Sequence, residues 1–261
     1  MLKSITFKKA NISFTDIGKG GAIVLLHGFL ENVTMWKNIA PELSKRNRVI
    51  SIDLLGHGKS DCLGYTHTME EQAEVVRSVL KHLRIRRCIL IGHSMGGYVA
   101  LAFTKLFTKN IKGLCLLNST FEQDNLERKQ LRKRANKMAQ NNYKNLVRMS
   151  FANLFSEESR TNFKNEIELA IKEALKTPVQ GYIAANEGMI LRKNFKSFFT
   201  NVTIKKAIIL GEKDWIVDSK KMISYAEKSN INYSLLTEGH MSHIENKEDL
   251  NDALKKFVKI C

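Results

Sequence analysis

Residues 92–96 (Gly-His-Ser-Met-Gly) limit the possible fold more than any other part of this chain. They follow an apolar, β-branched run over 88–91 that predicts a buried parallel strand, and they precede a run over 97–103 that predicts a helix. A sharp turn from strand to helix strains its central residue and leaves no room for side chains two positions either side. Glycine at both of those positions supplies the room, so we expect the Ser94 hydroxyl to stand clear of the sheet.

Strand and helix patterns alternate along most of the chain, which predicts an α/β fold with a mostly parallel, eight-stranded sheet and helices on both faces. The expected strands are 2–8, 10–16, 22–26, 48–53, 88–91, 111–117, 206–210 and 233–236. The expected helices are 34–44, 68–83, 97–103 and 247–259. Residues 68–71 form a capping box, which marks the start of the second of these helices.

The alternation stops between about residues 121 and 199, where the pattern is helical, rich in Lys, Arg, Asn and Glu, and interrupted once by Pro178. An insertion of roughly 80 residues between two strands of one sheet is far longer than an ordinary connection. We therefore expect a core formed by residues 1–120 and 201–261, with a helical cap or lid over 121–200.

Composition narrows the class of protein. The chain has 261 residues, 43% hydrophobic and 26% charged, enough to bury a full core. No apolar run approaches the roughly 18 residues that span a bilayer, and the first nine residues alternate like a strand rather than a signal peptide. We expect a cytoplasmic protein without a membrane partner. The four cysteines are scattered, which predicts reduced thiols rather than disulfides or a metal site.

The formal net charge of +16 raises the question of an anionic partner. The basic residues are spread along the chain, with one dense cluster on a predicted helix: Arg128, Lys129, Arg132, Lys133, Arg134 and Lys137. Neither interleaved aromatic residues nor a helix-turn-helix pattern accompanies this cluster, so no nucleic-acid partner is predicted. A charged helix face is usually solvated, and the alternative is that Arg128, Arg132 or Arg134 pairs with a substrate carboxylate.

A serine hydroxyl is a poor nucleophile without a base to take its proton and an acid to orient that base. Asp214 and His240 each follow a predicted strand near the carboxyl edge of the sheet, where an open parallel sheet places functional groups. The order Ser94, Asp214, His240 is the one expected with this kind of turn. We therefore predict these three residues as a catalytic triad.

Other residues compete for two of these roles. Asp218 and Glu212 are alternative acids, and His243 is an alternative base. Gly239 favours His240 over His243, because a glycine lets the chain turn sharply before the next side chain. His243 is then expected at the surface or packed within a loop.

An oxyanion hole needs two backbone N–H groups aimed at the developing negative charge. Met95 is expected to supply one, since it follows the serine at a helix N-terminus whose dipole favours an anion. Phe29, in the loop after the third predicted strand, is expected to supply the other. The side chains of His27 and His93 are expected to hydrogen-bond loop backbone.

Five motifs together resemble those of the α/β-hydrolase superfamily, in the same order. They are 27–29 (His-Gly-Phe), 53–60 (Asp-Leu-Leu-Gly-His-Gly-Lys-Ser), 92–97 (Gly-His-Ser-Met-Gly-Gly), 211–214 (Gly-Glu-Lys-Asp) and 239–240 (Gly-His). The resemblance covers the core on both sides of the insertion. It identifies residues 92–96 as a nucleophile elbow and implies an α/β-hydrolase fold with an inserted helical cap over the active site. It also implies that the 53–60 loop is structural.

One variant of this superfamily places the acid after the strand that precedes the cap. In this chain residues 118–120 read Asn-Ser-Thr at that position, so Asp214 is preferred. Asp124 and Glu122 lie near enough to remain alternatives. Because the elbow carries Ser94, the resemblance excludes the haloalkane dehalogenases and epoxide hydrolases of this fold, which use aspartate there.

The resemblance implies a carboxylesterase-like serine hydrolase that cleaves a carboxylic ester or similar acyl bond through an acyl-serine intermediate. One alternative is that the same triad catalyses C–C bond hydrolysis, lactone hydrolysis or elimination on an anionic small metabolite. Another is a non-catalytic ligand-binding protein. The expected pocket walls are Trp36, Tyr98, Phe121 and Trp215, with Met149 and Phe151 as further candidates. No metal cluster or G-x-G-x-x-G fingerprint is visible, so neither metal nor cofactor is expected, and monomer and homodimer both stay open.

Overall fold

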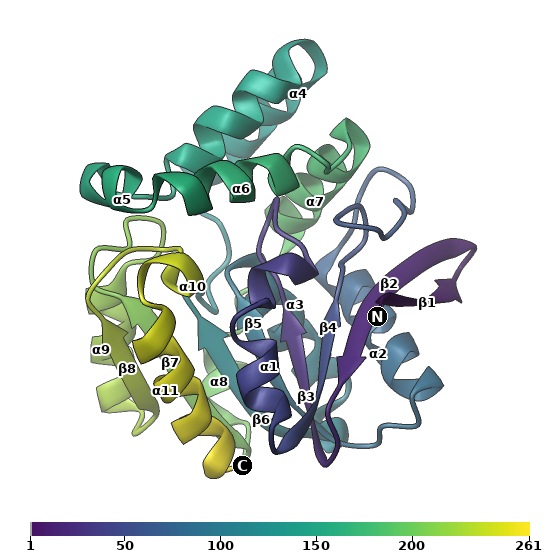
Figure 1. The fold of residues 1–261 in the computed structure, drawn as a ribbon, viewed down its shortest axis with the longest axis vertical. Coiled ribbons are helices and arrows are strands. Elements are labelled where there is room, and N and C mark those ends of the chain that lie inside the picture. Colours follow the sequence, from purple (N-terminus) through teal and green to yellow (C-terminus); the bar gives the residue numbers. More distant parts are fainter. Residues whose placement is uncertain (1) are drawn as a thin grey trace.

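A computed structural model describes residues 2–261 and contains an eight-stranded sheet of order β1-β2-β4-β3-β5-β6-β7-β8 (Figure 1). The strands are β1 (Leu2–Phe7), β2 (Ala10–Ile17), β3 (Gly21–Leu26), β4 (Asn47–Ile52), β5 (Cys88–His93), β6 (Ile111–Leu117), β7 (Lys205–Gly211) and β8 (Asn232–Leu236). β2 pairs antiparallel with β1 and β4, and every other pairing is parallel. The predicted mostly parallel eight-stranded sheet is confirmed.

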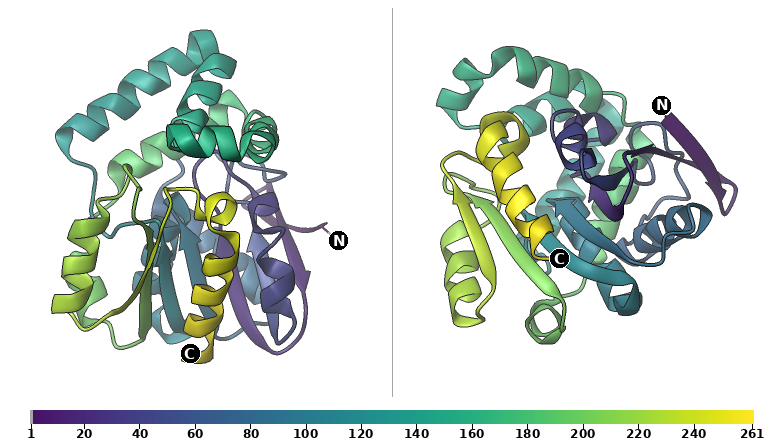
Figure 2. Two further views of the ribbon diagram at one scale, coloured as in Figure 1. Left: turned by 60° about the vertical axis from the view of Figure 1, so that its left-hand side comes forward. Right: turned by 60° about the horizontal axis from the view of Figure 1, so that its bottom comes forward.

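Helices cover both faces of this sheet (Figures 1 and 2). Successive residues of a strand point to opposite faces, so Val24 and Leu26 of β3 belong to one core and Ile23 and Leu25 to the other. The first core is closed by α2 (Met69–His82), α3 (Met95–Leu106) and α9 (Ser219–Lys228). The second is closed by α1 (Ala40–Ser44) and α11 (Lys247–Lys259). Both faces of the central strands are therefore buried, as their continuous apolar runs require.

Local signals explain several helix ends. The hydroxyl of Thr68 accepts a hydrogen bond from Glu71 N at 3.1 Å, so α2 begins as the capping box predicts. The predicted helix over 34–44 is instead two pieces, a 3₁₀ turn (Val33–Trp36) and α1. Pro41 has no N–H with which to continue a helix from the preceding turn, which accounts for the break. A second 3₁₀ turn (Thr108–Asn110) precedes β6.

Five helices lie between β6 and β7: α4 (Leu126–Ala152), α5 (Glu157–Asn162), α6 (Lys164–Ala174), α7 (Val179–Leu191) and α8 (Lys196–Asn201). Helices α4 to α7 lie above the carboxyl edge of the sheet (Figures 1 and 2). They share a third apolar cluster with loops of the core, including Leu30 and Met241. By contrast, α8 packs beside the sheet, because Phe199 lies in the first core. Within residues 2–261, no helix is long and apolar enough to span a membrane.

Candidate active site

The turn between β5 and α3 has the strained geometry that its glycines predict. Ser94 lies outside the helical region, with φ +49° and ψ −113°. A Cβ on Gly92 would be 2.3 Å from the backbone O of Gly96, and a Cβ on Gly96 would be 2.2 Å from the backbone O of Leu26. Ser94 N donates to Leu117 O at 2.9 Å, which fastens the turn to β6. The packing of strand, turn and helix therefore leaves no space for larger residues at the two glycine positions.

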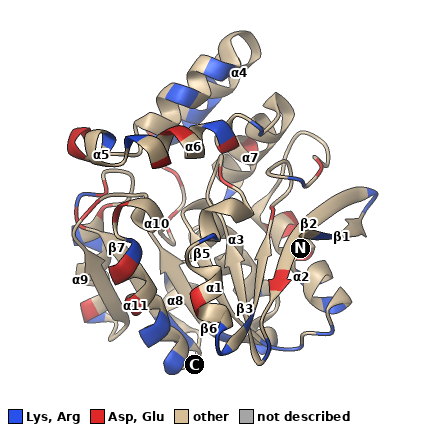
Figure 3. Cartoon of the chain, in the orientation of Figure 1, with Lys and Arg blue, Asp and Glu red and all other residues tan. Residues whose placement is uncertain are grey.

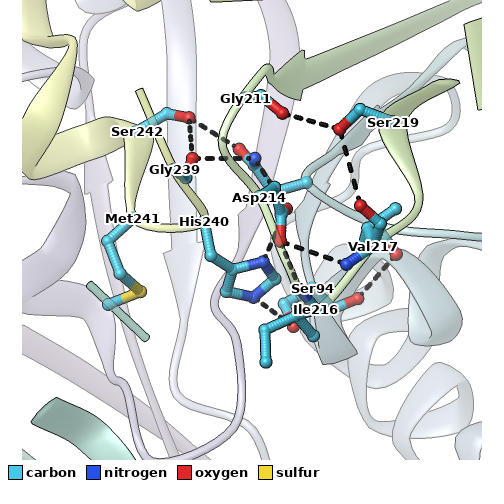
Figure 4. Close-up of polar contacts among 12 residues, drawn as sticks. Ser94, Gly211, Asp214, Ile216, Val217, Ser219, Gly239, His240, Met241 and Ser242 are labelled. Carbon is cyan, nitrogen blue, oxygen red and sulfur yellow. Dashed lines mark hydrogen bonds and ion pairs between the residues drawn. The ribbon is translucent and has the colours of Figure 1, made fainter. Parts of the chain in front are cut away.

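The structure brings Ser94, Asp214 and His240 together in a hydrogen-bonded chain (Figure 4). His240 Nδ1 lies 2.8 Å from Asp214 Oδ2, and His240 Nε2 lies 3.0 Å from Ser94 Oγ. A carboxylate can only accept, so Nδ1 carries the proton of a neutral imidazole and Nε2 accepts from the serine hydroxyl. This is the tautomer in which the imidazole can take the serine proton.

The carboxylate of Asp214 is held by four donors. Its Oδ1 accepts from Ile216 N at 2.8 Å and Val217 N at 3.0 Å, and its Oδ2 accepts from His240 and from Asn118 Nδ2 at 3.1 Å. Burial alone would raise the pKa of Asp214. Electrostatic attraction to His240 and the hydrogen bonds outweigh burial and lower the pKa of Asp214 below its ordinary value of 3.8. Asp214 therefore stays ionised beside His240 near neutral pH.

Asn118 joins the loops that carry the acid and the base. Besides its bond to Asp214, its Nδ2 donates to Gly239 O at 3.3 Å, and its Oδ1 accepts from the Ser242 hydroxyl at 2.8 Å. Asn118 stands after β6, at the position where the sequence offers no carboxylate. The sequence showed only that no carboxylate stands at this position. It did not reveal that the Asn118 amide hydrogen-bonds Asp214 and helps to hold it in place.

The loop after β3 lies against the nucleophile. A Cβ on Gly28 would be 3.2 Å from the Ser94 Cβ and 2.5 Å from Glu31 Oε2, so only glycine fits. Gly28 N donates to Glu31 Oε2 at 2.6 Å, which fixes the turn that presents Phe29. Met95 begins α3, where a backbone N–H has no acceptor within the helix. The two predicted oxyanion donors thus belong to segments that flank Ser94.

A buried network of Glu31, His93 and His243 lies directly behind the elbow. His93 Nδ1 is 2.7 Å from Glu31 Oε2, and His93 Nε2 is 3.0 Å from His240 O. His243 Nε2 is 3.7 Å from the other carboxylate oxygen. Since His93 bonds both Glu31 and the backbone of His240, it joins the loop after β3 to the loop that carries the base. His27 likewise bonds backbone, accepting from Leu54 N at 2.9 Å.

Charge and burial oppose each other in this network. Burial would raise the pKa of Glu31, but the charge of His93 lowers it to about 2. Burial would lower the pKa of His93, but Glu31 raises it above 6.5. Burial lowers the pKa of His243 to about 4. The result is a Glu31–His93 ion pair beside a neutral His243.

Sequence reasoning missed Glu31, although an acid four residues after His27 in the His-Gly-Phe-Leu-Glu run was a usable signal. One ligand atom from each of Glu31, His93 and His243 lies within 4.8 Å of the others, which is the spacing of a possible metal-binding group. Glu31 Oε2 and both ring nitrogens of His93 already have hydrogen-bond partners within the protein. A metal ion would have to replace the Glu31–His93 bond.

The alternative acids and base have other partners. Asp218 caps α9 by accepting from Lys221 N at 2.9 Å, and Glu212 is exposed. Glu122 pairs with the Lys221 side chain at 2.8 Å. Asp124 pairs with arginine side chains and not with His240. His243 is buried in the short helix α10 (Ser242–Glu245) and faces Glu31 of the loop after β3, so a surface position is wrong for it.

The cavity at Ser94 has a volume of about 150 Å³. It is lined by Gly28, Phe29, Leu30, Glu31, His93, Ser94, Tyr98, Arg128, Arg132, Ser150, Phe151, Leu154, Met189, Ile216, His240 and Met241. Of the predicted pocket walls, Tyr98 and Phe151 line it.

The structure corrects the other predicted walls. Trp36 is buried in the second core, on the far face of the sheet from α3. Phe121 stacks on Phe199, with ring centroids 5.7 Å apart, in the first core. Trp215 and Met149 are 64% and 65% exposed, and neither lines the cavity. Residue type and position in the sequence do not reveal which way an aromatic side chain points.

Known proteins resemble parts or all of this chain. An uncharacterized protein of Mycobacterium tuberculosis is 37% identical over 107 residues, which are 41% of this chain and 31% of that protein. The 2-hydroxy-6-oxo-2,4-heptadienoate hydrolase of Pseudomonas putida is 34% identical over 108 residues, 40% of this chain and 39% of that enzyme. The chain therefore matches less than half the length of these two relatives.

Solved structures match almost the whole chain. A thermophilic esterase from Thermogutta terrifontis, described as malate bound, has a TM-score of 0.92 at 26% identity, with 99% of this chain and 98% of that chain covered. The enol-lactonase from Burkholderia xenovorans LB400 has a TM-score of 0.91 at 19% identity, with 98% and 100% covered, and at this identity shows the fold alone. A family model described as alpha/beta hydrolase fold matches residues 21–247. Because that match includes most of the chain and agrees with the observed sheet and elbow, the chain belongs to the alpha/beta hydrolase fold family.

Proposed function

We propose that this protein is a serine hydrolase that cleaves a carboxylic ester, or a similar acyl bond, through an acyl-serine intermediate. The observation that carries the proposal is the chain of hydrogen bonds from Asp214 through His240 to Ser94, which ends at the cavity. The esterase of Thermogutta terrifontis supports the choice of an ester, since it is 26% identical over nearly the whole chain.

In the proposed reaction Ser94 Oγ attacks the carbonyl carbon of the ester while its proton passes to His240 Nε2. The amides of Phe29 and Met95 bind the oxygen that becomes negative. The C–O bond to the leaving group then breaks, and the alcohol leaves with the proton from Nε2. Water attacks the acyl-serine by the same route, which releases the acid and restores the Ser94 hydroxyl. Asp214 stays ionised and stabilises the imidazolium.

We also infer that α4 to α7 act as a cap, since they cover the carboxyl edge of the sheet where Ser94 stands. Residues 121–200 remain our proposed extent for it. We continue to predict a small-molecule substrate, a cytoplasmic location and no nucleic-acid partner. Monomer and homodimer both stay open.

Replacing the nucleophile tests the proposal. We expect Ser94→Ala to lower kcat on short p-nitrophenyl esters by about three to six orders of magnitude, since the whole triad acts as one unit. The wild type should also be labelled covalently by a fluorescent fluorophosphonate, and mass spectrometry should place the label on Ser94.

The exposed Ser197 provides a matched control, because Ser197→Ala should keep both activity and labelling. Turnover that survives Ser94→Ala would refute the role of this serine. A wild type that neither turns over esters nor reacts with the fluorophosphonate would instead favour a ligand-binding protein on a hydrolase fold.

A second candidate is C–C or lactone hydrolysis by the same three residues. It is favoured by the 34% identity to a 2-hydroxy-6-oxo-2,4-heptadienoate hydrolase, although the match covers only 40% of this chain. Comparing kcat/KM on a p-nitrophenyl ester, a lactone and a vinylogous 1,5-diketone acid separates these reactions. A preference of about 100-fold or more for either of the last two would replace the ester.

A further inference from the structure

Two basic side chains of α4 turn into the cavity that contains Ser94 and His240. Arg128 and Arg132 are four residues apart and so share one face of the helix, and their side chains are 38% and 15% exposed. Other basic residues of the helix, such as Arg134, are exposed. Figure 3 shows bands of basic residues along α4. Because Arg128 and Arg132 line the cavity, they differ from the basic residues on the solvated face of the helix.

One buried carboxylate, that of Asp124, faces three guanidinium groups. It lies 2.7 Å from Arg132 Nε, 2.9 Å from Arg192 Nη2 and 3.6 Å from Arg128 Nε. Within residues 2–261, no second carboxylate forms an ion pair with any of these arginines. The cluster therefore has two positive charges that no acidic side chain compensates. Arg132 is mostly buried, and a buried charge is unfavourable unless an anion pairs with it.

Arg192 is occupied by the protein. Its side chain is 4% exposed and its guanidinium lies 4.0 Å from the centre of the Tyr98 ring. Its Nε also donates to Glu122 O at 3.0 Å. Arg192 does not line the cavity, so it holds Asp124 and Tyr98 in place and leaves the other two arginines to face a ligand.

Arg128 and Arg132 are anchored by only some of their donors. Arg132 donates from Nε to Asp124 and from Nη1 to Asn186 Oδ1 at 3.0 Å. Arg128 donates from Nη1 to Ile216 O at 3.0 Å. A guanidinium has five N–H donors, so each side chain is fixed in direction and keeps donors with no partner among residues 2–261. The hydrogen bond to Ile216 O also ties the Arg128 side chain to the loop that follows Asp214.

We propose that Arg128 and Arg132 bind a carboxylate of the substrate, so that the preferred substrates are short esters or lactones that carry a free carboxylate. A planar guanidinium matches a carboxylate through two parallel hydrogen bonds. The cavity of about 150 Å³ limits the acid to a few carbons. This inference rests on the proposed function, because the bound carboxylate positions the scissile carbonyl at Ser94.

A pair of esters of the same shape tests the subsite. Monoethyl succinate carries the carboxylate, and ethyl 4-methylpentanoate has an isopropyl group in its place. We expect wild-type kcat/KM to favour the succinate ester by about tenfold or more, since hydrogen bonds between ionised partners are about twice as strong as neutral ones. Arg128→Gln should lower the succinate-to-pentanoate ratio by about tenfold, and Arg128→Lys should restore part of it. Acetoxyacetate, which has its carboxylate on the alcohol side, shows which half of the ester the arginines hold.

Arg134→Gln is the matched control. Arg134 is exposed on the same helix, so this substitution should leave the succinate-to-pentanoate ratio unchanged. Arg132→Gln should lower the ratio as well. Because this variant also loses the ion pair with Asp124, its melting temperature is compared with that of the wild type to show whether the fold is destabilised. A ratio that is near one in the wild type, or that neither Gln variant changes, would overturn the subsite while leaving a serine esterase in place.

Calorimetry with succinate itself provides a readout that needs no turnover. Binding to the wild type should weaken about tenfold or more in Arg128→Gln. Such binding without hydrolysis of any ester would support the carboxylate site and refute the esterase. Binding that is absent, or equal in both proteins, would refute the site whatever the protein catalyses.

Discussion

At the scale of single residues, the site depends on side chains that hold other side chains in place. Asp214 is ionised because His240, Asn118 and two backbone amides direct positive charge at it. Glu31 and His93 form a buried ion pair whose far end bonds the backbone of His240. Each of these groups acts by fixing the direction and charge of a neighbour, which is how preorganised sites hold a reacting group.

Asn118→Ala tests this positioning role. The change removes a charge-assisted hydrogen bond to Asp214 worth about 1.5–3 kcal/mol, so we expect kcat on esters to fall by about 10- to 100-fold with little change in KM. Asn141→Ala, on the exposed face of α4, is the control. A kcat within twofold of wild type would show that Asn118 is not needed for positioning.

At the scale of elements, the elbow depends on backbone contacts between β3, β5 and α3. We expect Gly96→Ala to lower the free energy of unfolding by about 2–4 kcal/mol, because the new Cβ would lie 2.2 Å from Leu26 O and neither backbone can move freely. Urea titration gives the comparison with wild type.

Gly21→Ala is the matched control, since at the start of β3 the nearest atom to a new Cβ is 3.8 Å away. It should change the stability by no more than about 0.5 kcal/mol. Equal stability of Gly96→Ala and the wild type would mean that the strand and helix can separate at the elbow.

At the scale of the whole molecule, buried histidines make the fold sensitive to acid. Burial lowers the pKa of His57 to about 3, and the pKa values of His67 and His243 to about 4. Unfolded histidines bind protons below about pH 6.5, so below that pH the unfolded state holds more protons and stability falls. The Glu31–His93 pair opposes this loss only between about pH 7 and pH 6, because His93 is already protonated in the folded state and gains its proton over that range in the unfolded state. We expect a loss on the order of 3–5 kcal/mol between pH 7 and pH 5, measured by urea unfolding.

His67→Gln isolates one of these groups. Leu63 N donates to His67 Nε2 at 3.0 Å, and the Gln carbonyl can accept in its place without titrating. The slope of stability against pH should fall by about 1.4 kcal/mol per unit between pH 6 and 5. The exposed His82→Gln should leave the slope as it is. A stability that is flat from pH 7 to 5 would contradict the buried, neutral state of these histidines.

Short stretches of sequence were enough to predict the sheet, the elbow and the three residues that the structure brings together at Ser94. Their signals are local: glycine spacing at a turn, apolar runs of strand length, and polar residues directly after strands. Only the tertiary structure decided that Arg128 and Arg132 face the cavity while Arg134 faces solvent, that Trp36 lies in the far core, and that Glu31 meets His93. Those contacts join residues far apart in the chain, and the direction of each side chain is set by how whole elements pack rather than by its neighbours in sequence.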